Sequence, residues 1–470
     1  MTDKTQPANS AADADSIDQE LYQKRKKIYP RQVKGLFASL RVSGVSLLLG
    51  FYYLMPWISW DGRQAILFDL PERKFYILGQ VFWPQDFIYL TMLLVIAALS
   101  LFFFTALAGR LWCGYACPQS VWTESFLWIE RMVEGSRQKQ IKLDKMPMNK
   151  EKLIKKFTKH FLWLAFALFT GFTFVGYFTP ILELAAAIPT FDFGPWELFW
   201  ILFYGFATYG NAGWLREQVC IYMCPYARFQ SAMFDSNTLV ISYDEKRGEP
   251  RGARKKSVDP VDVGLGSCVD CSICVQVCPT GIDIRDGLQY QCIGCAACID
   301  ACDDVMDKMG YEKGLIKYTT ENMLKGQHTN FMRPRILLYA FILLAITVGT
   351  IVGIANITPI ELDIIRDRNS LFRETGMGLV ENVYTLKVIN KDQAAHHYRL
   401  SVEGLPDPKM HMQKDDIYVE SGAVLELPVS IEVDPDKLEK RTTEVFFRLE
   451  ATDTDLSVVE EARFLGPLKR

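Results

Sequence analysis

The sequence predicts a multi-domain membrane protein with three parts: a five-helix transmembrane domain, an inserted α+β domain and a C-terminal all-β domain. Three observations predict this class. Five apolar runs are long enough to cross a bilayer. Eight cysteines form two regular runs between the fourth and fifth apolar runs, and the residues after the fifth contain short alternating segments. The length of 470 residues agrees with about three domains.

The apolar runs each come close to the roughly 20 residues that a helix needs to span a membrane. They are Leu36–Ile58, Phe87–Ala108, Phe161–Pro180, Trp196–Trp214 and Ile336–Ile357. These runs carry few charges, with Arg41 and Glu183 at or near their edges. A proton or ion pathway through them therefore has little support.

Basic residues predict the orientation, because cytoplasmic loops hold an excess of Lys and Arg. Six basic residues lie within 24–34, before the first span, and ten lie between Arg110 and Lys156, after the second. The loop after the first span has only three, and residues 181–195 have none. We therefore expect the N-terminus and the cysteine-rich stretch in the cytoplasm and the C-terminus outside. No signal peptide is expected before the first span.

The cysteine-rich stretch reads Cys268-x-x-Cys271-x-x-Cys274-x-x-x-Cys278-Pro279, followed by Cys292-x-x-Cys295-x-x-Cys298-x-x-x-Cys302. This is the ligand spacing of a bacterial ferredoxin with two [4Fe-4S] clusters, in which the fourth cysteine of each run ligates the other cluster. The first cluster is predicted on Cys268, Cys271, Cys274 and Cys302. The second cluster is predicted on Cys292, Cys295, Cys298 and Cys278.

Structural zinc and disulfides are the alternatives for these cysteines. Zinc needs four ligands per site and does not require two runs of four. All 12 cysteines fall on the predicted cytoplasmic side or its membrane edge, where a reducing environment favours thiolate ligation over disulfides. The second run departs from the pattern at Asp303, where a proline is usual, but no ligand is lost.

A second type of cysteine motif follows the second and the fourth span. The two copies are Cys113-x-x-x-Cys117-Pro118 and Cys220-x-x-x-Cys224-Pro225, an internal repeat of two helix pairs running in the same sense. Cysteines four apart share one face if the segment is helical, and a proline directly after suits the first turn of a following helix. Each motif alone also reads as ordinary buried cysteine.

Thiolates select Cu(I), zinc or iron–sulfur over hard cations. If Cys113, Cys117, Cys220 and Cys224 converge, they could hold copper or a third iron–sulfur cluster, and the sequence does not separate these two. A site that binds Cu(I) more tightly than Cu(II) makes copper easier to reduce. Each tenfold in that affinity ratio adds about 59 mV for one electron.

The C-terminal part predicts an immunoglobulin-like sandwich of about 100 residues. Its expected strands include Val383–Ile389, Tyr398–Val402, Val424–Val433 and Glu444–Leu449. The segment Met410-His411-Met412, with His396 and His397, is a weaker candidate for copper, because scattered His and Met on a sandwich usually serve packing or the surface. His328 reads as an ordinary loop residue.

Together, the two Cys-x-x-x-Cys-Pro motifs, the eight-cysteine insert, the fifth helix and the outer β-domain resemble the CcoG/FixG/RdxA family of accessory proteins for cbb-type cytochrome c oxidase. The resemblance implies a bacterial inner-membrane cupric reductase that converts Cu(II) to Cu(I) for a copper-exporting P-type ATPase and the oxidase assembly machinery. It implies that Cys113, Cys117, Cys220 and Cys224 bind and reduce copper, and that the ferredoxin cysteines supply electrons from a cytoplasmic donor.

Two other functions stay open at this point. The chain could be an electron-transfer subunit that exchanges electrons with quinol or a respiratory partner without copper chemistry. It could also be a copper-binding assembly scaffold with stabilising clusters. The net charge of −3 gives no reason to expect nucleic acid, and no P-loop, dinucleotide motif or nucleophile elbow is present. Whether the chain forms a homodimer is not decided.

The predicted domain boundaries follow from these motifs. They are 1–34, a disordered cytoplasmic N-terminus; 35–235, a four-helix transmembrane domain; 236–335, a cytoplasmic linker and ferredoxin domain; 336–357, the fifth transmembrane helix; and 358–470, a periplasmic β-domain. Basic residues in the linker are expected to contact anionic lipid headgroups.

Overall fold

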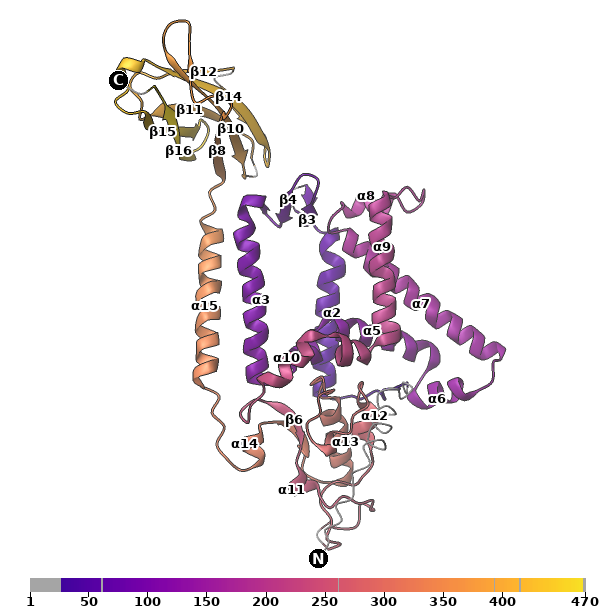
Figure 1. The fold of residues 1–470 in the computed structure, drawn as a ribbon. Helices are drawn as coiled ribbons and strands as arrows, with labels where there is room; N and C mark the ends of the chain where they lie inside the picture. The colour runs from indigo at the N-terminus through magenta and orange to yellow at the C-terminus, as the bar shows by residue number, and fades with distance from the viewer. Residues whose placement is uncertain (1–26, 61, 261, 393, 414–415, 468–470) are drawn as a thin grey trace, which may run out of the picture. The chain divides into compact units, whose positions relative to one another are not determined.

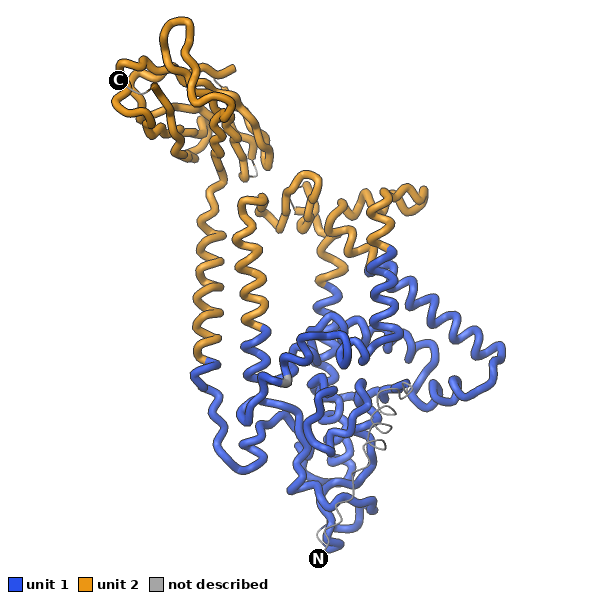
Figure 2. The backbone as a smooth tube through the Cα atoms, in the orientation of Figure 1, with its two compact units in different colours: residues 1–50, 101–170, 202–336 blue, residues 51–100, 171–201, 337–470 orange. Residues whose placement is uncertain are grey.

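The computed structural model describes residues 27–467, apart from residues 61, 261, 393 and 414–415. Most of the N-terminal segment predicted to be disordered lies outside the described residues. The chain forms two compact units whose segments alternate along the sequence (Figure 2). The first contains residues 1–50, 101–170 and 202–336, and the second contains residues 51–100, 171–201 and 337–470.

Four helices in the described ranges are long and apolar enough to cross a membrane (Figure 1). They are α2 (Leu36–Leu54), α3 (Phe87–Ala108), α7 (Lys150–Val175) and α15 (Pro334–Ala355). The expected count of five is not confirmed. In the fourth apolar run the α-helix α9 (Pro195–Thr208) has 14 residues and continues as a π-helical turn, Tyr209–Leu215. At about 1.5 Å per residue, α9 alone is shorter than the roughly 30 Å hydrocarbon core.

Short elements of the first unit carry both kinds of cysteine motif. The helices are α4 (Leu111–Tyr115), α5 (Pro118–Glu134), α6 (Arg137–Lys145), α10 (Pro225–Met233), α11 (Glu245–Gly248), α12 (Ile273–Val277), α13 (Ala297–Met309) and α14 (Glu321–Leu324). One antiparallel pair, β6 (Val240–Tyr243) with β7 (Ile316–Thr319), brackets the ferredoxin stretch in sequence. The pair shares a core with α12 and α13 that includes Ile241, Ile299 and Met306.

The C-terminal part of the second unit is a sandwich of two antiparallel sheets, which confirms the predicted all-β domain. One sheet has the order β12–β14–β10–β8, with the short β9 beside β10, and the other has the order β13–β11–β15–β16. The strands are β8 (Ile360–Arg366), β9 (Arg373–Glu374), β10 (Val380–Asn390), β11 (His396–Glu403), β12 (Lys409–Met412), β13 (Ile417–Val419), β14 (Val424–Val433), β15 (Thr442–Ala451) and β16 (Ser457–Leu465).

Alternation of buried and partly exposed residues along the central strands explains this sandwich. On β10 every second side chain from Val380 to Leu386 is buried, as expected where one face of a strand meets a core. Tyr384 of one sheet packs edge-on against Phe447 of the other, with ring centroids 5.1 Å apart. In Figure 1, α15 leads into β8 through a short connecting segment.

The loop expected between the first two spans contains small strands. Strands β3 (Ile66–Asp69), β4 (Lys74–Ile77) and β5 (Gln80–Phe82) form a three-stranded sheet, preceded by the pair β1 (Ser59–Trp60) and β2 (Arg63–Gln64). The Gln64 side chain accepts a hydrogen bond from the backbone N–H of Ile181, at the start of α8 (Ile181–Ala186).

The same loop is joined to the sandwich by one buried lysine. Val81, Trp83 and Ile389 form a small apolar core. Beside it the Lys391 ammonium lies 3.1 Å from Asp86 and 2.6 Å from Glu361, and its side chain is only 7% exposed. This ammonium therefore depends on both carboxylates for its charge compensation.

We expect Lys391→Met to lower the free energy of unfolding of the second unit by on the order of 3 kcal/mol, because two carboxylates lose their cation. The measurement is thermal unfolding of the full chain in detergent. Lys387→Met is the matched control, since its pair with Glu426 is more exposed and should contribute much less to stability. Equal effects of the two substitutions would contradict a stabilising role of the Lys391 ion pairs.

Candidate iron–sulfur and thiolate site

The ferredoxin cysteines border two small neighbouring cavities of about 20 Å³ each. The first is lined by Cys268, Cys271, Cys274 and Cys302. The second is lined by Cys278, Cys292, Cys295 and Cys298, together with Cys274. The fourth cysteine of each run thus lies with the first three of the other run. This is the grouping that the sequence spacing predicts for two cubanes, while ligation of iron itself stays a prediction.

The backbone makes the same turn in both runs. Ser272 and Ala296 have positive φ angles of 54° and 58°, and each stands directly before the helix, α12 or α13, that carries the next cysteine. In the second run, α13 continues past Cys302 to Met309. A proline at position 303 would lie inside this helix and disrupt it, which explains why Asp303 stands there. Its carboxylate accepts a hydrogen bond from the Gly314 N–H.

The two membrane motifs are built alike around their prolines. Cys117 and Cys224 are the residues before α5 and α10, and Pro118 and Pro225 occupy the first helical turns, as the sequence predicts. The earlier cysteines differ: Cys113 lies on α4, which ends at Tyr115, whereas Cys220 lies on a π-helical turn, Val219–Met223. Neither pair therefore lies on one face of a regular α-helix.

The four membrane-motif thiols lie within electrostatic range of one another. Burial, with smaller effects of the neighbouring Cys117 and Cys220 thiols, raises the pKa of Cys113 to about 12. Burial likewise raises the pKa of Cys220 to about 11, with added effects of Cys117 and Cys224. These thiols are protonated at neutral pH, so a metal ion must displace protons to bind. Within the described ranges, no three His, Cys, Asp or Glu side chains form a preassembled metal site.

A backbone contact joins the first membrane motif to the loop of the second cubane. A Cβ atom on Gly114 would lie 2.6 Å from the Gly294 carbonyl oxygen and 3.0 Å from the Cys295 Cα. Gly294 itself has φ +68°, and a Cβ there would lie 3.0 Å from the Arg110 carbonyl oxygen. Side chains are excluded on both sides, so the helix that carries Cys113 and the cluster loop touch through their backbones.

Two arginines and a tyrosine hold this contact. The Arg110 guanidinium donates hydrogen bonds to the carbonyls of Tyr290, Cys292 and Ala227, at 2.5, 3.0 and 3.0 Å. Arg41 donates to the Cys295 carbonyl. The Tyr318 hydroxyl donates to the Gly294 carbonyl at 2.7 Å. Each donor satisfies a carbonyl of the loop that carries predicted cluster ligands.

Gln230 is a buried polar neighbour of Cys113. Its Oε1 lies 3.5 Å from the Cys113 sulfur, the side chain is 0% exposed, and Nε2 has no hydrogen-bond partner among the described residues. A buried donor without a partner is rare in native proteins. In the structure, the Gln230 carbonyl oxygen can accept a hydrogen bond from the Cys113 thiol. Rotation of the amide would instead let its N–H donate a hydrogen bond to the deprotonated sulfur, so Gln230 can stabilise either form of Cys113.

The second membrane motif is held by buried charges. Arg216, four residues before Cys220, donates to Glu130 of α5 at 2.8 Å. Lys159 of α7 lies 3.3 Å from Glu130 and 2.8 Å from Glu134. Burial alone would raise the pKa of Glu130, but Arg216, Lys27 and Lys159 outweigh it and lower the pKa to about 2. The carboxylate is therefore ionised throughout the physiological range.

Arg110, Arg216, Glu130 and Gln230 were not identified from the sequence. An arginine stands three residues before Cys113 and another four residues before Cys220, and this repetition was the signal available.

The histidines of the sandwich do not form a cluster: His396 and His397 lie on β11 of one sheet, and His411 lies on β12 of the other. His396 instead contacts the carboxylates of Asp392 and Asp453, both at 2.9 Å.

Comparisons with known proteins agree with this architecture. Family models of a 4Fe-4S dicluster domain match residues 215–321, and those of a 4Fe-4S binding domain match residues 90–133. The IG-like fold at the C-terminal of FixG matches residues 350–467. Nitrogen fixation protein FixG of Rhizobium meliloti is 38% identical over 451 residues, 87% of this chain and 86% of its own length. The chain belongs to the FixG/RdxA family.

Two further FixG/RdxA relatives are from Cereibacter sphaeroides. RdxB is 40% identical over 85% of this chain and 86% of its own length, and RdxA is 38% identical over 83% and 84%. A crystal structure of a FixG-related protein from Vibrio parahaemolyticus is 45% identical over 24% of this chain and 100% of its own, with a TM-score of 0.23. The 4Fe-4S domains in a FixG/RdxA chain with apolar helices indicate a membrane-associated electron-transfer oxidoreductase.

We expect Gly114→Ala to push the cluster loop away from the Cys113 helix, because the new methyl group would overlap the Gly294 carbonyl. Overpacking of this kind costs about 1–3 kcal/mol. Thermal unfolding in detergent and the rate at which reduced clusters pass electrons onward are the measurements. Gly50→Ala on α2 is the control, because a Cβ there meets nothing within 4 Å. Wild-type values for Gly114→Ala would refute the contact.

The low pKa of Glu130 predicts acid-dependent stability. Its ionised form stabilises the fold at pH values above the usual carboxyl pKa, and this stabilisation is lost as the pH falls toward 2. The loss is on the order of 3 kcal/mol. Glu130→Gln should therefore lower stability at pH 7 and flatten its decline between pH 6 and pH 3, measured by thermal unfolding.

Proposed function

We propose that this protein is a membrane-bound iron–sulfur cupric reductase, which passes electrons through two [4Fe-4S] clusters to Cu(II) at the four membrane-motif cysteines. The contact of Gly114 with Gly294 carries this proposal, because it puts the loop of the second cluster directly against the helix of Cys113. Cys113, Cys117, Cys220 and Cys224 would bind the copper, which is the substrate.

The proposed electron path begins at the first cluster. Cys271 is the exposed member of the eight ferredoxin cysteines, so a cytoplasmic donor would reach this cluster most easily. Cys274 lines both cluster cavities, and the second cavity carries Cys292 and Cys295, next to Arg110 and Gly114. The [4Fe-4S] groups supply one-electron transfer when they are bound. The residues of the chain hold the two sites in contact.

Copper chemistry follows from the softness of the ligands. Thiolates favour Cu(I) over harder ions, so their binding favours the reduced product. For each Cu(II) reduced to Cu(I), one electron leaves the clusters, and the protonated thiols release protons as they bind the metal. The product would pass to a copper-exporting P-type ATPase for assembly of a cbb-type oxidase in the inner membrane. Lipid surrounds the spans, the ferredoxin domain faces the cytoplasm and the sandwich faces the periplasm in this proposal.

A second candidate is an electron-transfer subunit with a third iron–sulfur cluster on the membrane cysteines and no copper chemistry. The match of residues 90–133 to a 4Fe-4S binding domain favours it, because this range includes Cys113 and Cys117. Metal content separates the two candidates. A third cluster adds one cubane of iron per chain, whereas a copper site leaves the iron of two cubanes.

We expect replacement of Cys113, Cys117, Cys220 and Cys224 by Ser to abolish Cu(I) formation while EPR still shows two reducible clusters. Chemically reduced protein, Cu(II) and a Cu(I) chelator give the assay, and metal analysis gives iron and copper. Tyr222→Phe is the control, since Tyr222 lies between Cys220 and Cys224 but is 67% exposed. Undiminished Cu(I) formation by the serine variant would reject the copper site, and loss of one cubane of iron would favour the second candidate.

A further inference from the structure

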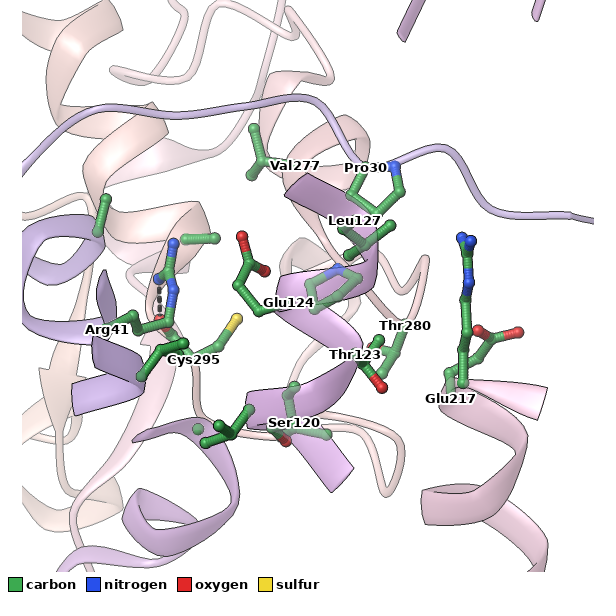
Figure 3. A pocket seen from close by; sticks show the side chains of 18 of the residues that line it. Pro30, Arg41, Ser120, Thr123, Glu124, Leu127, Glu217, Val277, Thr280 and Cys295 are labelled. Carbon is green, nitrogen blue, oxygen red and sulfur yellow. Dashed lines mark hydrogen bonds between the residues drawn. The ribbon is translucent and has the colours of Figure 1, made fainter. Parts of the chain in front are cut away.

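A cavity lies between the second cluster and the second membrane motif (Figure 3). Its volume is about 140 Å³, and its walls include both Cys295 and Cys220. In Figure 3, Arg41 and Cys295 lie at one side and Glu217 at the other, with Ser120, Thr123 and Leu127 of α5 between them. An occupant of this cavity would therefore touch elements of both redox sites.

The cavity combines an apolar surface with charged and hydroxyl groups. Apolar side chains of α2, α5 and the cluster loops supply most of the surface, among them Val45, Leu127 and Val277. Val42 lines the cavity and is also 47% exposed on the spanning helix α2, so the cavity reaches a surface of the chain that faces lipid in the proposed orientation. A lipid-soluble molecule could enter there.

Basic residues outnumber acidic residues in the lining. Four arginines (31, 41, 131 and 216) and two glutamates (124 and 217) line the cavity, and Glu130 outside the lining compensates Arg216, which leaves an excess of one positive charge. Such a field stabilises an oxygen atom that gains negative charge. Arg41 uses one nitrogen on the Cys295 carbonyl, and Ser120 and Thr123 carry hydroxyl groups on the same wall.

We propose that this cavity binds the ring of a quinone, which exchanges electrons with the second cluster. A quinone is lipid-soluble and planar, accepts hydrogen bonds through two carbonyl oxygens, and carries negative charge after one-electron reduction, which matches the apolar, cationic lining. The inference uses the clusters of the proposed function but not its copper chemistry. Each reduced cubane gives one electron, and the quinone takes these two electrons and two protons from water to become hydroquinone. The reverse reaction reduces both cubanes.

The test uses the full chain with its clusters, in detergent and without oxygen, with decylubiquinone or decylubiquinol as the probe. The cluster potential decides the direction of the reaction: the quinone oxidises dithionite-reduced clusters, or the quinol reduces oxidised clusters. Absorbance and EPR measure the oxidation state of the clusters in both cases. We expect Thr123→Trp and Val45→Phe, which fill the cavity, to slow this exchange at least tenfold. Oxidation of the same reduced variants by ferricyanide should keep its wild-type rate, which shows that the clusters are intact.

Leu288→Trp is the control, because it introduces the same indole ring beside a separate cavity that Cys292 lines. A second readout is binding: the quinone should quench the fluorescence of Trp128, which lines the cavity, saturably in the wild type and not in Trp128→Phe. Equal exchange rates in filled and control variants, no exchange in either direction, or a flavin or haem found in the purified cavity would each overturn the proposal. Absence of Cu(I) formation by the wild-type protein, with quinone exchange intact, would instead count against the proposed copper site alone.

Discussion

The close approach of two glycines is the constraint on which the rest of the first unit depends. Gly114 and Gly294 let the backbone of a membrane-motif helix touch the backbone of a cluster loop, and any side chain at either position would separate them. The loop is then held by donors to its own carbonyls, from Arg110, Arg41 and Tyr318. Two sites that are far apart in sequence thereby share one rigid boundary, which an electron-transfer protein requires of its redox centres.

Buried ion pairs hold the second membrane motif in place. Glu130 compensates Arg216 and Lys159, and Arg216 has a positive φ of 46° three residues before the start of the turn that carries Cys220. Removal of ions from water is costly, and an apolar core of the same shape would often be at least as stable. These ion pairs therefore serve to fix the position of the second membrane motif more than to add stability. Hydrogen bonds between guanidinium and carboxylate groups have a preferred direction, which apolar contacts lack.

Much of the fold could be predicted because it follows from local patterns. Three thiolates two residues apart must wrap a cluster, and strict alternation on residues such as those of β10 must give a half-buried strand. The roles of Arg110 and Gln230 could not be predicted, since carbonyl recognition across more than a hundred residues leaves no periodic trace. The shortened α9 was missed for a related reason: composition shows that a segment is apolar, but a π-helical turn depends on packing.

Cys220 finally shows why the cavity matters for the thiolate site. Its sulfur belongs to the second membrane motif, and its side chain also lines the cavity that reaches Cys295. A molecule in that cavity would contact the side chain of Cys220 and so limit how a metal ion can approach its sulfur. If occupancy of the cavity changes the metal affinity of Cys220, then by reciprocity a metal on Cys220 changes the affinity of the cavity for its ligand by the same factor.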